Sequence, residues 1–470
     1  MVSTPKEHST KSFISVHSSQ DGRLSKTQRQ SEFSAVKDDL FVSSRSHASD
    51  TQIHCIVTLD SRLDGDLYKK SLSYTIRQNP ILACRFVNQK NEHAYWQETS
   101  ELKVDEYLQL VESNEIDAEI HKFLTSPIDV YKGPIFKALI IRSAADVLCF
   151  KVSHVLADAG GVKELVGIIA DTYSNLQSNA PIKNQTNAID RSLYPIYKQI
   201  NFIKKAKIVL YGMRVYINKN YPSKNWALPL KASQQKKKTI IKLHVNKNQF
   251  ESLKIFCNKN KVTMNDVITA AIFRALHKYI HPTNITPLRI ISTVDLRRFY
   301  PTNHTGLIAN CASLIYINIG RSIGKDIFET TSKVNQAILW QKQGAFGLDF
   351  HLFSIKQPAK IPFPVYTIIH RLAKWLSGVI NTPSVLPVFT NMGNIENTTV
   401  KFGIANAIGA YLTAPIANYP GLIIGMSGFN RSLTITSGFC ESVITEDSMQ
   451  SLFSHISKDI DEIVHWTPVN

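Results

Sequence analysis

Histidine and aspartate four positions apart can carry out acid–base chemistry, and this H-x-x-x-D spacing occurs three times. The three pairs are His17 with Asp21, His154 with Asp158, and His455 with Asp459. A neutral imidazole can accept a proton from a hydroxyl or an amine while that group attacks a carbonyl. Because the chain has 15 histidines, so short a pattern also matches by chance. The surroundings of each pair must therefore distinguish them.

Only the second pair follows an apolar, strand-like run. His154 continues the alternation of residues 147–153, and Gly160 and Gly161 open a predicted helix behind it. Apolar surroundings disfavour the charged imidazole and keep it neutral near pH 7, as a general base requires. The alternative for His154 is a buried side chain satisfied by backbone groups. The first pair lies in a polar terminal segment, and the third suits the surface of a C-terminal helix.

Strand and helix patterns alternate on both sides of this motif. A buried strand is predicted over 81–87, and the runs 134–142 and 147–153 are predicted as a hairpin. The next helix has apolar residues at positions i, i+3, i+4 and i+7, namely Val162, Leu165, Val166 and Ile169. A longer amphipathic helix is predicted over 192–220, with Ile196, Ile200, Ile203, Ile217, Leu210 and Met213 along one side.

These patterns predict an α/β (α+β) protein with two halves of similar size. The predicted segments are a disordered tail at 1–30, an N-terminal subdomain carrying the motif at 31–185, a basic crossover at 186–238 and a C-terminal subdomain at 239–470. Hydrophobic residues make up 43% of the 470 residues and charged residues 19%, so a disordered or fibrous chain is excluded.

Several common classes of site lack their motifs. The sequence contains no G-x-G-x-x-G, Walker A, G-x-S-x-G or H-E-x-x-H pattern, and its six cysteines form no C-x-x-C pair. We therefore expect no metal and a reducing compartment. No stretch has the length and apolarity of a membrane-spanning helix or a secretory signal. The expected localisation is cytoplasmic, with peripheral membrane contact as a further option.

The positive charge of the chain is local. The net charge is +17, and residues 191–266 contribute most of it because Glu251 is the only acid there before Asp266. This basic segment, 191–265, could attract the phosphates of coenzyme A, an acidic acyl carrier protein or an anionic membrane surface. The alternative is a solvated crossover whose lysines keep it soluble. Nucleic acid is not an expected partner, because no groove-reading motif accompanies the charge.

The segment S-H-V-L-A-D-A-G-G, Ser153 to Gly161, resembles the H-H-x-x-x-D-G motif of the chloramphenicol acetyltransferase-like superfamily. This superfamily includes condensation domains, alcohol acetyltransferases and polyketide-associated acyltransferases. Other family segments are matched, in order, by Asn79-Pro80-Ile81-Leu82, Pro127-Ile128-Asp129, Gly133-Pro134-Ile135, Val294-Asp295-Leu296-Arg297-Arg298, residues 306–310 and Thr390-Asn391-Met392-Gly393. The resemblance covers residues from about 30 to about 465 and implies two such subdomains with an active-site tunnel between them.

Roles follow from this resemblance residue by residue. It implies that His154 is the general base, that Asp158 shapes the motif loop, and that Arg297 pairs with Asp158. A buried aspartate without a partner would be costly, which gives the pairing its physical reason. Gly161 would be a structural glycine of the loop. The alternative for Arg297 is a surface charge at a strand end.

Two asparagines are weaker candidates. The resemblance places Asn310 and Asn391 near the tunnel or near a developing oxyanion, whereas turn chemistry is the alternative for both. The sequence also departs from the family pattern: Ser153 replaces the first histidine and Ala159 replaces the glycine after the aspartate. A D-F-G-W-G segment is missing, which disfavours the plant type of enzyme.

The resulting prediction is a stand-alone acyltransferase, a monomer without a bound cofactor. It would move an acyl group from an acyl-CoA or acyl-carrier thioester to an alcohol or amine, in lipid or secondary-metabolite biosynthesis. Two alternatives stay open. One is a condensation enzyme that forms amides between carrier-bound substrates, and the other is a catalytically silent binding protein of the same fold.

Overall fold

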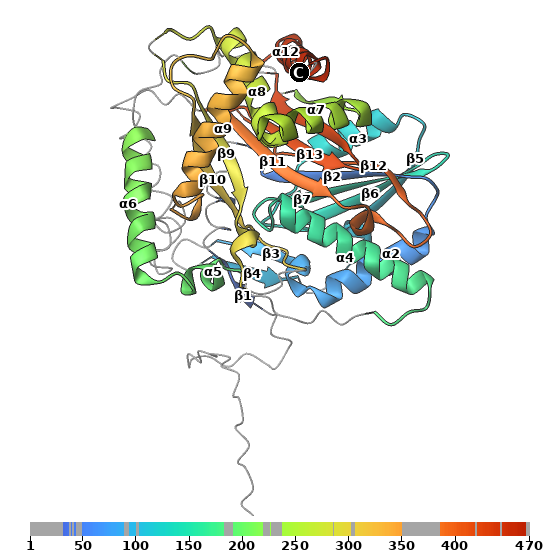
Figure 1. Ribbon diagram of the computed structural model, residues 1–470. Helices are drawn as coiled ribbons and strands as arrows, with labels where there is room; N and C mark the ends of the chain where they lie inside the picture. The colour runs from blue at the N-terminus through green and yellow to red at the C-terminus, as the bar shows by residue number, and fades with distance from the viewer. Residues whose placement is uncertain are drawn as a thin grey trace, which may run out of the picture.

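Two large β-sheets organise the protein, whose computed structural model is shown in Figure 1. The structure describes residues 32–36, 39, 42–43, 49–88, 94–99, 103–182, 191–219, 226, 237–284, 286–301, 306–349, 386–418, 421–441 and 444–466. The predicted tail at 1–30, which includes the pair His17 and Asp21, lies outside these residues. No described helix combines the length and the hydrophobicity that a membrane-spanning segment requires.

The first sheet has five strands and carries the motif. Its order is β12 (Ala407–Thr413), β2 (Gln52–Leu59), β7 (Asp146–Ser153), β6 (Phe136–Arg142) and β5 (Leu108–Glu112). Helices α2 (Gly65–Gln78) and α4 (Ala159–Gln177) pack on one face, and α3 (Ile116–Thr125) packs on the other. Because both faces are covered, β7 is buried at every residue.

The second sheet has six strands. Its order is β10 (Ala312–Asn318), β9 (Arg289–Asp295), β11 (Val388–Ile395), β13 (Ile423–Phe429), β14 (Ser432–Cys440) and β8 (Lys238–Val245). The helices that share its core are α7 (Lys247–Asn260), α8 (Met264–Ile280), α9 (Ile327–Gln343) and α12 (Glu446–Val464). Both large sheets mix parallel and antiparallel pairs.

The two halves are linked by an exchanged strand. β12 follows β11 in the sequence, but it pairs with β2 of the first sheet rather than with its own neighbours in the second. A small third sheet of β1 (Glu32–Ser34), β4 (Tyr95–Glu98) and β3 (Cys84–Val87) lies beside the first half. The fold class is confirmed, namely two halves that each combine a mixed sheet with helices, while the exact subdomain boundaries stay a prediction.

Two predicted elements need correction. The strand predicted over 81–87 begins only at Cys84, because Pro80–Ala83 form a 3₁₀ turn. The helix predicted over 192–220 is two helices, α5 (Tyr194–Lys198) and α6 (Phe202–Lys219). The Asn201 side chain accepts a hydrogen bond from the backbone N–H of Lys204 at 2.8 Å. An asparagine that caps a new helix in this way ends the preceding one.

The predicted buried side of this helix is also wrong in part. Ile196 and Ile200 are buried as expected. Ile203 and Leu210 instead point to solvent, and Ile208 packs inward. The break at Asn201 changes the rotation of α6 relative to α5, so one helical phase cannot describe both segments.

Candidate active site

His154 lies directly after β7, where the strand turns into the motif loop. Its backbone N–H donates to Thr51 O at 2.7 Å. Its ring Nδ1 lies 3.1 Å from Ala157 O and 3.1 Å from Asn310 Oδ1. The Asn310 amide nitrogen donates to the backbone oxygens of His154 and Val155 at 2.9 and 3.1 Å, which orients the amide. Both neighbours of Nδ1 are therefore oxygen acceptors, so Nδ1 carries the proton and Nε2 keeps its lone pair.

The electrostatic surroundings favour the same neutral ring. Burial lowers the pKa of His154 below its ordinary value, and the negative charge of Asp158 opposes this only in part. Burial disfavours the imidazolium because it removes water from the charged form. The ring is therefore neutral at pH 7 and able to accept a proton.

Asp158 caps α4 and is tied to the second half of the molecule. Its carboxylate accepts hydrogen bonds from the backbone N–H groups of Gly161 at 2.9 Å and Cys311 at 2.7 Å. Arg297 Nη1 lies 2.8 and 2.9 Å from its two oxygens. Asp158 and Arg297 are each 4% exposed. All of these contacts stabilise the motif loop, and none of them is made to the imidazole of His154.

The charge on Asp158 is maintained despite its burial. Burial by itself raises the pKa of this carboxyl, but the Arg297 guanidinium and the two backbone N–H groups outweigh it and hold the pKa below its ordinary value. Arg297 in turn donates to Ala309 O at 2.8 Å. The structure thus brings Asp158 and Arg297 together as a buried ion pair, and the surface alternative for Arg297 is wrong.

Gly161 permits a close approach between the halves. A β-carbon at this position would lie 2.9 Å from both Ala157 Cβ and Ala309 O. A backbone atom such as Ala309 O cannot move aside unless its whole loop shifts. The missing side chain therefore lets the start of α4 touch the loop that carries Asn310.

Asn391 does not take part in the hydrogen bonds that hold the imidazole of His154. It stands on β11 in the wall of the cavity described below, and its amide nitrogen donates to Asn265 Oδ1 at 3.2 Å. Its side-chain oxygen accepts from the backbone N–H of Gly393 at 3.0 Å, next to an irregularity in the strand pairing. Asn391 therefore has the turn role that was the alternative for it, and it also lines the cavity.

Two residues near the site were missed by sequence reasoning. Lys163 on α4 lines the cavity and donates to Asn394 O at 3.1 Å. Arg191 donates to Leu156 O at 2.7 Å in the motif loop and to Ile308 O at 3.1 Å in the Asn310 loop. It also forms an ion pair with the buried Asp39. No local pattern marks Arg191, because its partners come from distant parts of the chain.

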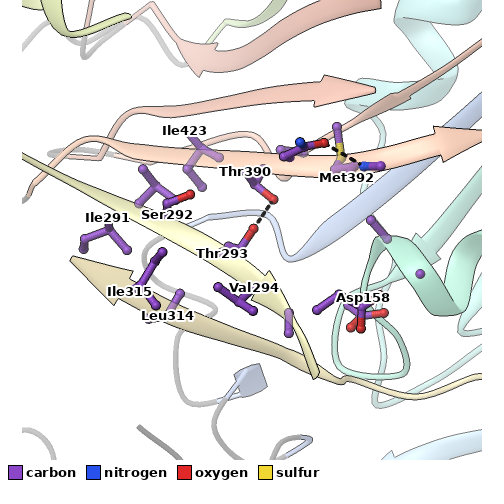
Figure 2. A pocket seen from close by; sticks show the side chains of 18 of the residues that line it. Asp158, Ile291, Ser292, Thr293, Val294, Leu314, Ile315, Thr390, Met392 and Ile423 are labelled. Atoms are coloured by element: carbon purple, nitrogen blue, oxygen red, sulfur yellow. Dashed lines mark hydrogen bonds between the residues drawn. The ribbon is translucent and has the colours of Figure 1, made fainter. Parts of the chain in front are cut away.

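A cavity of about 700 Å³ extends from His154 into the space between the halves (Figure 2). Strands β9 and β11 pair only at Val388 with Ile291 and Phe389 with Ser292, and then diverge. Thr293 and Thr390 face each other at this divergence, with their hydroxyl oxygens 2.8 Å apart. Because the hydroxyls satisfy each other, they can lie beside apolar side chains of the cavity wall without an unpaired polar group.

The apolar lining follows the strand register. Ile291, Val388 and Ile423 are register partners on the adjacent strands β9, β11 and β13, and all three line the cavity. Leu314 pairs with Thr293 in the next row toward His154. The described residues contain no cluster of three His, Cys, Asp or Glu side chains that could hold a metal ion.

Comparison with known proteins gives three kinds of result. The family model of the condensation domain matches residues 40–287, which is more than half of the chain. No curated protein sequence matches. Solved structures match over nearly the whole chain, at identities that show the fold alone.

Three of these solved structures illustrate the range. The first condensation domain of the CDA synthetase has a TM-score of 0.67 at 12% identity, covering 94% of this chain and 98% of that chain. TRI3 trichothecene 15-O-acetyltransferase from Fusarium sporotrichioides has a TM-score of 0.66 at 11% identity, with coverages of 93% and 96%. A variant of the starter condensation domain of rhizomide synthetase RzmA, in complex with C8-CoA, has a TM-score of 0.63 at 13% identity, covering 92% of this chain and 94% of that chain.

Proposed function

The chain belongs to the condensation-domain family, and from this we propose that it is an acyltransferase. It would move an acyl group from a coenzyme A or carrier-protein thioester to an alcohol or an amine. The observation that carries the proposal is the Nδ1 atom of His154, held between two oxygen acceptors so that Nε2 is a free base beside a cavity. The names of similar structures support the class, since one is an acetyltransferase and another contains C8-CoA.

The proposed reaction needs one proton acceptor. His154 Nε2 takes the proton of the acceptor O–H or N–H while the oxygen or nitrogen attacks the thioester carbon. The carbon–sulfur bond then breaks, and the imidazolium returns the proton to the departing thiolate. The Ala157 and Asn310 oxygens stabilise the imidazolium by accepting from Nδ1–H throughout.

The other predicted site residues receive supporting roles in this proposal. We assign Asp158, Arg297 and Gly161 to the shape of the loop, since their contacts are to backbone groups and to each other. Asn310 positions the ring, because its oxygen faces Nδ1 and its nitrogen binds the loop carbonyls. Asn391 faces the cavity and stays a candidate contact for substrate.

Removing the proposed base tests the mechanism. We expect His154→Ala to lower kcat by about 10² to 10⁴-fold, the usual contribution of a general base. Release of free thiol from a panel of acyl-CoA and acyl-carrier thioesters, with alcohols and amines as acceptors, measures this. The matched control is His455→Ala, since His455 has the same spacing to an aspartate but lies on α12, where Asp459 pairs with Arg274. Full activity of a folded His154→Ala variant would refute the mechanism.

The cavity also suggests the kind of substrate. Successive rows of a strand's face lie about 6.6 Å apart, so the apolar row of Ile291, Val388 and Ile423 lies two rows from Asp295, beyond the row that contains Thr293. Water beside this apolar row has few polar partners, whereas an aliphatic chain there would be stabilised by about 0.8 kcal/mol per buried methylene. We therefore propose that one of the two substrates carries an unbranched aliphatic chain.

A chain-length series tests this substrate class. We expect kcat/KM to rise about threefold to fourfold per methylene until the channel is full, in the donor series if the acyl chain occupies it and in the acceptor series if the acceptor does. Ile423→Trp should end the rise at a shorter chain. The matched control Ile408→Trp alters an isoleucine of β12 that is 64% exposed and does not line the cavity. Rates independent of length in both series would contradict the proposal.

A further inference from the structure

Helix α6 exposes an apolar face to solvent. Phe202 and Leu210 are 84% and 61% exposed, and Ala206 lies between them in the same helical row. Ile203 is 67% exposed beside Phe202. Seven large apolar side chains among the described residues are more than 60% exposed, and four of them lie within residues 194–210. Such a concentration of exposed apolar groups is unusual for a surface without a partner.

The opposite side of α6 is the one that packs against the protein. Ile208 is buried, and Tyr211 donates its hydroxyl to Gln341 Oε1 on α9 at 2.7 Å. The Tyr211 ring also lies 5.1 Å from that of Trp340, and it occupies the space that a side chain on Gly344 would need. Figure 1 shows α6 at the left edge of the molecule, beside α9. The helix is therefore anchored by one side while its apolar face points away.

Positive charge surrounds this face. Residues 191–219 contain seven lysines and arginines and no acidic residue. Lys207 is exposed and Lys205 is partly exposed on the two flanks of this face, whereas Lys204 is exposed in the row of Ile208 at the start of α6. None of the three forms an ion pair with any described residue. Their charge is thus available to an external partner.

We propose that the exposed face of α6 binds an anionic lipid surface. A helix that combines an outward apolar face with flanking lysines lies in the headgroup region, with the apolar side chains inserted and the lysines near the lipid phosphates. Phe202, Ile203 and Leu210 would insert, and Lys205 and Lys207, which flank them on the helix, would contact the headgroups. A membrane fits better than an acidic protein because Phe202, Ile203 and Leu210 together form a protruding apolar face, which needs an apolar phase to cover it as well as negative charge beside it. This inference does not depend on the proposed acyl transfer.

Vesicle binding by the full chain tests the inference. We expect the protein to cosediment with phosphatidylcholine vesicles containing 30% phosphatidylserine at low salt, and binding should weaken at high salt. Phe202→Ser combined with Leu210→Ser should reduce partitioning at least tenfold. Lys205→Gln combined with Lys207→Gln should reduce it about fivefold per lysine on anionic vesicles only.

Matched controls use exposed residues elsewhere. Ile404→Ser combined with Ile408→Ser removes two isoleucines that are 82% and 64% exposed, and Lys247→Gln combined with Lys254→Gln removes two exposed lysines of α7. Both control variants should bind vesicles as the unaltered chain does. The inference is overturned if the chain does not bind anionic vesicles, if the α6 variants bind unchanged, or if α6 instead recruits an acidic carrier protein without binding vesicles.

Discussion

At the scale of single residues, His154 is oriented by neutral oxygens rather than by a carboxylate. Asp158, the acid of the same loop, binds Arg297 and two backbone N–H groups through its carboxylate oxygens. A carboxylate on Nδ1 would stabilise the imidazolium and raise the pKa of the ring. The hydrogen bond to the neutral amide of Asn310 orients the ring and also raises its pKa, but by less than burial lowers it. Burial therefore remains the largest influence on the pKa of His154 and keeps it low.

This arrangement predicts the pH dependence of the proposed reaction. Since the pKa of His154 is lowered, the acid limb of kcat/KM should lie below the ordinary histidine pKa of about 6.5. Asn310→Asp places a carboxylate beside Nδ1 and should move that limb to higher pH by about one unit or more. Measured pH profiles of both proteins check this, with thermal unfolding as a test of folding. An unchanged acid limb in the variant would show that Asn310 does not set the electrostatics of the ring.

At the scale of elements, the site depends on two loops that come from different halves. One loop joins β7 to α4 and carries His154, and the other precedes β10 and carries Asn310. Arg191 donates to a backbone oxygen in each loop, Leu156 O and Ile308 O. Its charge is balanced by Asp39, which also accepts from Trp96 Nε1 at 2.8 Å. Arg191 therefore helps to fix the relative position of the loops, together with the contacts of Arg297 and Asn310.

Replacement of this guanidinium by an ammonium tests its role. Arg191→Lys keeps the charge beside Asp39 but cannot reproduce the planar set of donors that reaches both loops. We expect kcat to fall about tenfold or more with a smaller change in KM, because small misplacements of a base are costly. Steady-state kinetics measure the separate changes in kcat and KM. Addition of free guanidinium to Arg191→Ala should restore part of the rate, whereas loss of stability with unchanged kcat would indicate a purely structural role.

At the scale of the whole molecule, the exchanged strand joins the halves through a buried polar contact. His54 on β2 faces Thr413 on β12 in the pairing register, and its Nδ1 lies 2.6 Å from Thr413 Oγ1. His54 is fully buried, and burial together with the positive charges of Lys151 and Lys238 lowers its pKa to about 3. The folded protein therefore holds this imidazole neutral well below the pH at which the unfolded chain would protonate it.

Stability should consequently depend on pH through His54. The folded-state pKa is below the unfolded value of about 6.5, so this contribution is complete above pH 6.5 and is lost as the pH falls toward 3. Between pH 7 and pH 5 the loss amounts to about 2 kcal/mol in the free energy of unfolding. Urea unfolding at both pH values measures it. His54→Gln, which cannot titrate, should show a correspondingly smaller difference, and an equal difference would contradict the assignment.

Residues close together in the sequence determined a large part of this architecture and of the candidate site. The hairpin of β6 and β7, the start of α4 and the placement of His154 and Asp158 between them follow from local alternation, helical spacing and capping. The pairing of Asp158 with Arg297 was accessible only through resemblance to a family, since 139 positions separate them.

Only the tertiary structure decided the rest. Asn310 reaches His154 across 156 positions, and Arg191 reaches the Asn310 loop across 117. Which side of α6 is packed depended on α9. Periodicity records which residues share a face but not which face meets a neighbour. Long-range hydrogen bonds leave no periodic trace at all, because each needs only one donor and one acceptor brought together by the fold.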